Sequence, residues 1–269
     1  MKAVQVHHGH RNAASRPAAW NAFAALMGLY LLALLAVLPI AAARPSQGPS
    51  RLAAFGVDAL VGLFLGALAS WLGLRLGGRV GLGAPLLRAR PGTPPGWTWL
   101  LPAVCIGLGF GAFAAVSLWA LQALSLLPGD LWSEAQRAPW KGILVSVSAA
   151  IKEEILLRFG LMTLLVWIFA RLTPRESAGP GAVWAGNIVA ALLFGAAHLP
   201  AAASVTTLTA AVVAVALVFN AIAGVTFGWL YWRRGILAAI VAHFSADIVL
   251  QVLFPLVVGA SASDAKSGG

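Results

Sequence analysis

Six residues in the second half of the sequence have the types and spacing that acid–base chemistry requires. They are Glu153, Glu154, Arg158, His198, His243 and Asp247. Carboxylates and imidazoles are the usual general acids and bases of enzymes, and in membranes they also form proton relays. All six lie within apolar segments, where a charged side chain at the centre of a bilayer costs at least about 2.5–3.5 kcal/mol. Because such residues are costly to bury, their presence in these segments predicts a functional site.

The first group places two adjacent glutamates and an arginine on one expected helix. Glu154 and Arg158 are four residues apart, so on a helix they share a face and can form an ion pair. Glu153 points about 100° away from Glu154 and is left without that partner. Because a carboxylate removed from water and from cations binds a proton more readily, we expect Glu153 to be a general base that the other two brace. A buried structural network of all three is the alternative.

Histidines occur in two further groups. His198 follows Phe194 near the end of one apolar segment, and His243 and Asp247 lie one helical turn apart in another. A single buried histidine is more often a hydrogen-bonded core residue than a catalyst. Two histidines and three carboxylates on three segments of one small bundle instead favour a shared site. Asp58, in an earlier segment, has no partner there, and we expect it to have a packing or relay role.

The composition excludes an ordinary soluble enzyme. Of the 269 residues, 60 % are hydrophobic and only 10 % are charged, whereas about a quarter of the residues of a soluble domain are charged. The apolar segments lack the alternation of barrel strands, and most are long enough to cross a bilayer as helices. The sequence therefore predicts an all-α fold, a polytopic transmembrane helix bundle of about 7–8 spans. The segments are 20–43, 52–74, 100–127, 142–170, 182–199, 205–232 and 235–259.

These segments divide the chain into four parts. We expect an N-terminal cytoplasmic tail over 1–19, helices without a motif over 20–127, a catalytic core over 141–258 and a disordered tail over 259–269. Most basic residues outside the spans fall on the side of the N-terminus, which predicts a cytoplasmic N-terminus in the cell membrane. The basic loops are expected to meet anionic lipids, and they explain the net charge of +10 without nucleic acid.

One turn is expected to line the site. Residues 182–232 contain no Asp, Glu, Lys or Arg, so the turn 199–204 between two spans has no charge that would hold it in water. We therefore expect this turn, which contains Pro200, to be non-helical backbone sunk into the bundle. Such backbone is tolerated at membrane depth where it lines a cavity.

Taken in order, the three groups resemble the motifs of one family. Glu-Glu-x-x-x-Arg, Phe-x-x-x-His and His-x-x-x-Asp/Asn are similar to those of the CPBP intramembrane proteases, which include type II CAAX prenyl endopeptidases and bacteriocin-processing or immunity proteins. The resemblance covers about residues 141–253, including the stretch 228–235 before the last motif, while the first three segments carry none of its motifs. It implies a helical bundle with a conical internal cavity in which a peptide bond is hydrolysed.

The resemblance also implies a role for each residue. Glu153 matches the glutamate that activates water together with the histidine matched by His198. His243 and Asp247 match the pair that stabilises the oxyanion. Glu154 and Arg158 complete the first motif. CAAX endopeptidases carry Asn where this chain has Asp247. Since an ionised aspartate would repel an oxyanion, Asp247 must be protonated or must instead orient His243.

The activity expected on these grounds is that of an intramembrane endopeptidase. Its substrate would be a membrane-associated protein or peptide, cleaved by water that a glutamate and a histidine activate, with no cofactor. A composition rich in Ala, Gly, Leu and Arg is typical of bacteria and disfavours prenylated substrates.

Two other interpretations stay open. One is a zinc-dependent intramembrane protease, because Glu153, His198 and His243 are possible zinc ligands, although the His-Glu-x-x-His spacing is absent. The other is a non-catalytic membrane protein such as a bacteriocin-immunity factor, a scaffold or a proton-coupled carrier, since intramembrane carboxylates and histidines also form relays. The two halves of the sequence show no inverted repeat, which argues against a carrier.

Overall fold

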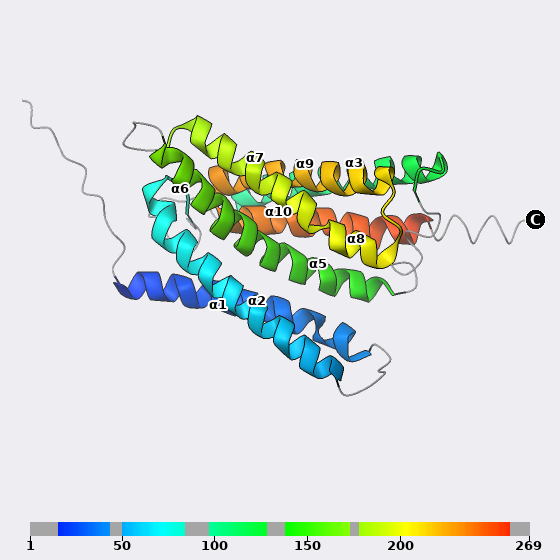
Figure 1. Cartoon of the computed structure of the whole chain (residues 1–269), viewed down its shortest axis with the longest axis horizontal. Coiled ribbons are helices and arrows are strands. Elements are labelled where there is room, and N and C mark those ends of the chain that lie inside the picture. Colours follow the sequence, from blue (N-terminus) through cyan, green and yellow to red (C-terminus); the bar gives the residue numbers. More distant parts are fainter. Residues whose placement is uncertain (1–15, 44–49, 84–96, 128–137, 173–177, 259–269) are drawn as a thin grey trace, which may run out of the picture.

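Every regular element in the described part of the chain is a helix (Figure 1). The computed structural model describes residues 16–43, 50–83, 97–127, 138–172 and 178–258. The expected all-α fold is confirmed for these residues, whereas the tail 259–269 and most of the tail 1–19 lie outside them. The elements are α1 (Arg16–Ala43), α2 (Ser50–Leu76), η1 (Gly77–Arg79), α3 (Trp97–Ala123), α5 (Pro139–Glu153), η3 (Glu154–Met162), α6 (Thr163–Arg171), α7 (Pro180–Ala197), α8 (Leu199–Val205), α9 (Ala210–Arg234), α10 (Ile236–Ile248) and η4 (Val249–Leu253).

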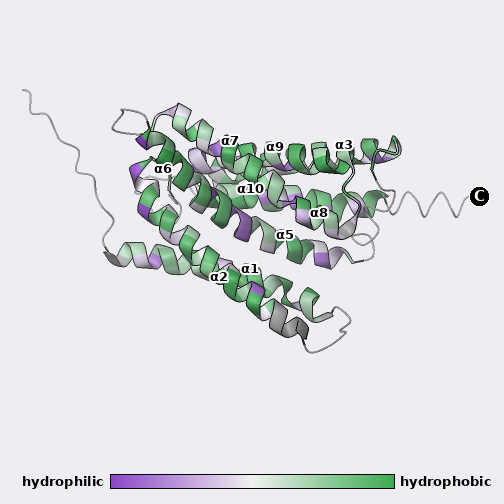
Figure 2. Cartoon of the chain, in the orientation of Figure 1, coloured by the Kyte–Doolittle hydropathy of each residue, from purple (hydrophilic) through white to green (hydrophobic). Residues whose placement is uncertain are grey.

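Within the described residues, six helices are long and apolar enough to cross a membrane, and Figure 2 shows hydrophobic residues along most of their length. They correspond to six of the seven expected segments. The remaining segment, 142–170, folds as a continuous helical path through α5, η3 and α6. It is less apolar than the others because four charged residues lie between positions 152 and 158. The chain is a multi-pass helical membrane protein.

The helices that carry the motifs lie together in the bundle, and α1 and α2 lie along its outside (Figure 1). α10 packs against α3, α9 and α5, while α7 packs against α9, α6 and η3. α1 and α2 contact each other and pack on α5 and η3. The carboxylates of α5 and η3 therefore approach α10 from a neighbouring helix, as the sequence motifs require.

Glycines set the distance between α3 and α10. Gly107 and Gly111 lie one turn apart on α3, and a Cβ atom at Gly111 would lie 2.6 Å from the carbonyl oxygen of Ala246. A Cβ atom at Gly107 would clash with the carbonyl oxygen of Ala242. Because lipid tails are as apolar as the side chains themselves, helices in membranes associate through such close packing. The glycines thereby hold α3 directly against the part of α10 that carries the third motif.

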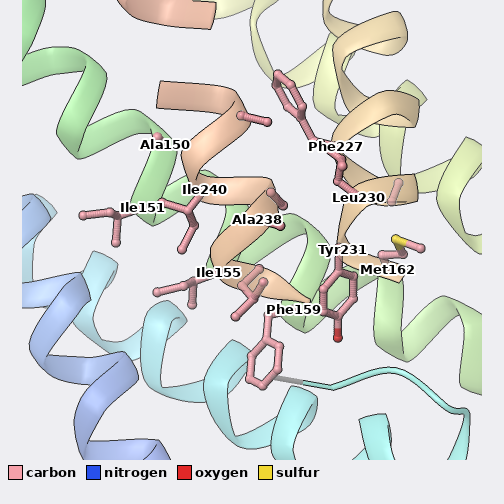
Figure 3. Close-up of a cluster of buried hydrophobic side chains, with 14 of the residues drawn as sticks. Ala150, Ile151, Ile155, Phe159, Met162, Phe227, Leu230, Tyr231, Ala238 and Ile240 are labelled. Carbon is pink, nitrogen blue, oxygen red and sulfur yellow. The ribbon is translucent and has the colours of Figure 1, made fainter. Parts of the chain in front are cut away.

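A cluster of buried side chains joins η3, α9 and α10 (Figure 3). Phe159 of η3 and Tyr231 of α9 meet edge to face, with their ring centroids 6.2 Å apart. The Tyr231 hydroxyl lies 2.8 Å from Oγ1 of Thr163, and that Thr163 hydroxyl also donates to the carbonyl oxygen of Arg158 at 3.2 Å. Since buried hydroxyls need partners, these bonds tie α9 to the end of the helix that carries the first motif.

The segment around Pro200 differs from the expectation. Instead of a non-helical turn, Leu199–Val205 forms the helix α8, and the side chains of Ala201 and Ala203 are exposed rather than sunk into the bundle. Proline has a fixed φ and no N–H, which suits the first turn of a helix, where the N–H has no intrahelical partner. Pro200 lies in that first turn, so it starts a helix here rather than breaking one.

Candidate active site

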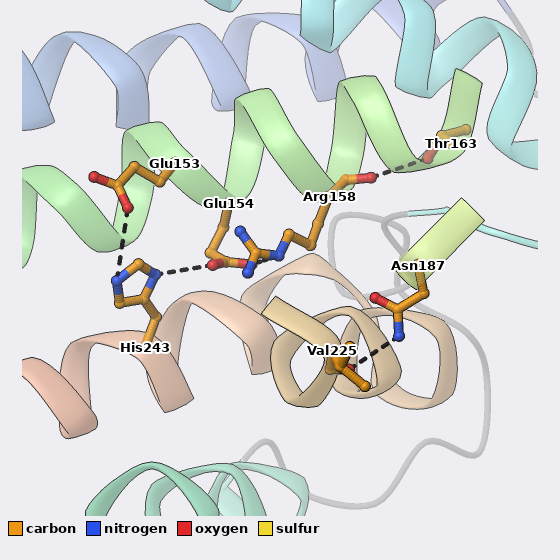
Figure 4. A network of polar contacts seen from close by, with 7 residues as sticks. All are labelled: Glu153, Glu154, Arg158, Thr163, Asn187, Val225 and His243. Carbon is orange, nitrogen blue, oxygen red and sulfur yellow. Dashed lines mark hydrogen bonds and ion pairs between the residues drawn. The ribbon is translucent and has the colours of Figure 1, made fainter. Parts of the chain in front are cut away.

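Glu154 lies at the centre of a buried polar network (Figure 4). One of its carboxylate oxygens, Oε2, lies 3.3 Å from Nε of Arg158, which is the ion pair expected from their spacing. Its other oxygen, Oε1, lies 2.8 Å from Nδ1 of His243 on α10. The second contact was not predicted, because it joins residues that are far apart in the sequence. Glu154 thus connects the first motif to the third.

The opposite side of the His243 ring faces two further carboxylates. Its Nε2 atom lies 3.7 Å from Oδ2 of Asp247 and 3.9 Å from Oε2 of Glu153. Both distances are longer than a direct hydrogen bond. An ionised Glu154 can only accept, so it fixes Nδ1 of His243 as a donor and leaves Nε2 as the atom that faces the other two acids. The structure brings all three carboxylates of the motifs to one imidazole.

The three carboxylates differ in their access to the outside of the protein. The side chain of Glu153 is 30 % exposed, that of Asp247 is 14 % exposed, and that of Glu154 is 0 % exposed. Oε2 of Glu153 is itself buried and has no hydrogen-bond partner among the described residues. Glu153 therefore reaches from the buried imidazole towards the open side, whereas Glu154 is sealed inside.

Phe194, the first residue of the second motif, packs against three site residues at once. The guanidinium of Arg158 lies over its ring, 4.4 Å from the centroid. The ring of His198 meets it edge-on at 4.6 Å, and the ring of His243 lies at 6.1 Å. The sequence analysis gave Phe194 no role of its own. The only available signal was its fixed place in the Phe-x-x-x-His motif.

His198 lies at the edge of this arrangement. It follows the last residue of α7, is half-buried, and its Nδ1 atom lies 2.9 Å from the carbonyl oxygen of Phe194 on its own helix. In the described part of the chain, it has no direct hydrogen bond or ion pair with Glu153, so the structure places it beside the carboxylate–imidazole cluster through Phe194. The remaining five predicted site residues form one contact network.

Two changes of helical geometry border the site. α5 passes into the π-helix η3 at Glu154, and α10 passes into the π-helix η4 at Val249, two residues after Asp247. Stretches of π-helix are rare and are frequently found at functional sites. The sequence predicted regular helices at both places. The ion pair of Glu154 with Arg158 forms nonetheless, since residues one turn apart remain neighbours.

Asp58 is not part of the site. Its side chain is exposed on α2, on the outside of the bundle. This exposure contradicts the packing role, one of the two roles expected of Asp58, and the relay role stays a prediction. Because Asp58 is an acid on a membrane-spanning helix outside the site, it is a suitable control for the acids of the site.

A cavity of about 170 Å³ adjoins the site between α3, α7, α9 and α10. His243 and Asp247 line it, together with aromatic side chains that include Phe194 and Phe227. The ring of Phe227 stacks on His243, 5.0 Å away and tilted by 21°. A larger groove of about 530 Å³ between α1 and α2 has apolar walls and Arg75, with no acid or histidine, so it is unsuited to hydrolysis.

The residues considered for zinc do not form a metal centre. Across residues 16–258 with the gaps given above, no group of three or more His, Cys, Asp or Glu side chains is arranged to hold a metal ion. Glu153, His198 and His243 are therefore not gathered as a set of ligands in this structure.

The fold and this cluster define a multi-pass membrane protein with an acid–base site inside its helices. Residues 135–249 match the family model described as type II CAAX prenyl endopeptidase, Rce1-like. This segment therefore carries the CAAX-protease domain that the family model describes, and this family implies intramembrane protease activity. The resemblance inferred from the motifs is thereby confirmed. No curated protein and no solved structure matches the chain.

Proposed function

We propose that the chain is an intramembrane endopeptidase that hydrolyses a peptide bond of a membrane-associated protein or peptide. The observation that carries this proposal is the division of labour between the two adjacent glutamates. Glu154 is sealed and bonded to Arg158 and His243, whereas Glu153 is part-exposed and its Oε2 atom accepts no hydrogen bond among the described residues. Of the two adjacent glutamates, Glu153 is therefore the one that we propose takes a proton from water, which is the task of a general base.

The proposed reaction needs only residues of this chain. Glu153 takes one proton from a water molecule while the hydroxyl oxygen attacks the peptide carbonyl carbon, and the carbonyl electron pair moves onto oxygen. The resulting oxyanion accepts a hydrogen bond from Nε2–H of His243. As the oxyanion electron pair re-forms the C=O bond and the C–N bond breaks, the leaving nitrogen takes the proton held by Glu153. The products are a carboxylic acid and an amine, and the carboxylate of Glu153 is restored. Donors that point at developing charge in a dry site supply several kcal/mol, about 2.7–4 for one donor.

Glu154 and Arg158 support this step without touching the substrate. Donation from Nδ1–H of His243 to Glu154 holds the ring in place and stabilises it as an imidazolium, which can still donate from Nε2. The guanidinium of Arg158 balances the negative charge of Glu154 and lies over the ring of Phe194. We propose that His198 is the second residue that binds the attacking water. Its Nδ1 atom is bonded to its own helix, which leaves its Nε2 atom for the water.

We also propose a setting for the enzyme. The N-terminus is cytoplasmic in this proposal, and exposed Arg75 and Arg79, at the end of α2 and in η1, contact anionic lipid headgroups. The substrate is proposed to be a peptide near the membrane of a bacterial cell rather than a prenylated protein, on the strength of the composition.

The test compares the membrane peptides of cells that express the parent protein, Glu153→Gln or Asp58→Asn. We expect uncleaved precursors to accumulate with Glu153→Gln, and cleaved products to persist with Asp58→Asn, which removes an exposed acid outside the site. Identical peptide sets from the parent and Glu153→Gln would contradict proteolysis and favour a non-catalytic membrane partner.

A further inference from the structure

The cavity beside the site extends away from His243 along three helices. α3, α9 and α10 supply most of the residues that line it, and Phe194 of α7 also lines it. Its volume of about 170 Å³ is below the roughly 300–1,000 Å³ of clefts that enclose a whole small-molecule ligand. The space is suited to part of a chain that continues beyond it. The inference that follows rests on the proposed function, because it takes this cavity to hold the substrate.

Asn220 is the one polar residue of this wall that no motif accounts for. His243 and Asp247 belong to the site, and the other lining residues are Ala, Val, Leu and Phe. Asn220 is half-buried on α9, in a segment that has no charged residue before Arg233. A polar side chain is costly in such surroundings unless it finds hydrogen-bond partners.

Among the described residues, the hydrogen-bonding capacity of Asn220 is only partly satisfied. Its Nδ2 atom donates to the carbonyl oxygen of Ala216, one turn back on α9, at 2.8 Å. A carboxamide has two N–H donors and a carbonyl oxygen that accepts. One N–H and the Oδ1 atom therefore remain for the cavity. Together they complement a backbone peptide group, which offers one acceptor and one donor.

The position of Asn220 along α9 fixes how far from the site it would bind. Asn220, Ala223 and Phe227 lie on one stripe of α9 that lines the cavity, and Phe227 stacks on His243. Seven residues of helix separate Asn220 from Phe227, which is about 10 Å at 1.5 Å per residue. An extended peptide rises about 3.3 Å per residue, so about three residues span this distance.

We infer that Asn220 is a positioning residue that pairs with a backbone amide of an extended peptide, about three residues from the bond that faces His243. The apolar walls then hold the intervening side chains, and the carboxamide sets the register of the peptide. Register matters because a displacement of one residue would place a different bond at Glu153. Asn220 contacts no reacting atom, so its effect is on binding and on the choice of bond.

The test measures peptide retention separately from cleavage. The inactive Glu153→Gln protein, in nanodiscs, is exposed to a library of short apolar synthetic peptides, and the retained peptides are identified by mass spectrometry. The same is done after adding Asn220→Leu, which keeps the size of the side chain, or Thr226→Val. Thr226 is the matched control, because it also bonds to a carbonyl one turn back on α9 but does not line the cavity.

We expect Asn220→Leu to weaken retention by roughly two- to tenfold, the effect of losing one or two amide hydrogen bonds, and Thr226→Val to leave it unchanged. N-methylation of one backbone nitrogen, scanned along a retained peptide, should weaken binding at a single position, and only when Asn220 is present. Equal retention with and without Asn220, or equal loss with Thr226→Val, would overturn the inference. Peptides that are retained through Asn220 but are not cleaved by the parent protein would instead contradict the proposed function alone.

Discussion

Nδ1 of His243 on α10 lies 2.8 Å from Oε1 of Glu154 at the start of η3. This bond joins the first and third motifs and uses one of the two adjacent glutamates to hold the histidine. The other glutamate, Glu153, is thereby left for the role of base in the proposed mechanism. The paired glutamates of the motif are not interchangeable, because one faces the interior and the other faces the open side.

Glu154→Gln is expected to destabilise the protein, whereas Glu153→Gln is expected to leave its stability near that of the parent. The first change leaves the buried Arg158 without its anionic partner, and breaking a buried pair in this way costs about 3–5 kcal/mol. Thermal unfolding in detergent, followed by the fluorescence of the tryptophans, measures both variants. Equal melting temperatures for the two variants would show that Glu154 does not hold the network together.

Phe194→Leu is expected to loosen the site while keeping α7 in place. The change removes the ring beneath the Arg158 guanidinium, a contact that contributes about 0.5–2 kcal/mol, together with the edge contact to His198. Unfolding free energy and peptidase rate should both fall. The neighbouring Leu193→Ala is the control, because Leu193 is exposed on the same helix. A parent-like rate for Phe194→Leu would mean that the ring does not position the site.

Asp247→Asn is expected to keep activity within about tenfold of the parent, and Asp247→Leu to lose it. An amide preserves the shape of the side chain, can donate a hydrogen bond and removes a negative charge that faces Nε2 of His243. The CAAX endopeptidases that the chain resembles carry Asn at this position. The measurement is the initial rate of peptide hydrolysis by the parent and by each of the two variants. An Asn variant as inactive as the Leu variant would show that an ionised carboxylate is required at this position.

Gly111→Ala is expected to lower both stability and activity, and Gly109→Ala to change neither. A Cβ atom at Gly111 would lie 2.6 Å from the carbonyl oxygen of Ala246, next to Asp247, whereas one at Gly109 would meet nothing within 4 Å. Overpacking of this kind costs about 1–3 kcal/mol and would push α10 away from α3. Unfolding free energy and peptidase rate are measured for both variants, which carry the same substitution at two positions of α3. If both glycines tolerate alanine equally, α3 does not fix the position of α10.

Local spacing explains why much of the site could be predicted. The Glu154–Arg158 and His243–Asp247 contacts lie one helical turn apart, so the sequence alone places each pair on a common face. The bond between Glu154 and His243 depends on how α10 packs against η3, which no local pattern encodes. The same holds for Phe194, whose ring meets Arg158 of η3 and His243 of α10.

Backbone geometry was harder to predict than residue pairing. Nothing in the sequence pattern distinguishes the π-helices η3 and η4 from regular helix, because residues one turn apart are neighbours in both geometries. Pro200 was interpreted as the mark of a turn, although proline is also favoured in the first turn of a helix such as α8. Asn220 had a signal, since it is a polar residue in an uncharged segment, but the cavity that gives it a purpose is visible only in three dimensions.

The most direct test of the account measures hydrolysis of one identified peptide by purified protein in nanodiscs, per mole of folded protein. With Glu153→Gln, we predict a rate about 100- to 10,000-fold below that of the parent, the range expected when a general base is lost, at an unchanged melting temperature. A folded Glu153→Gln protein that cleaves the peptide at the parent rate would contradict the assignment of Glu153 as the base.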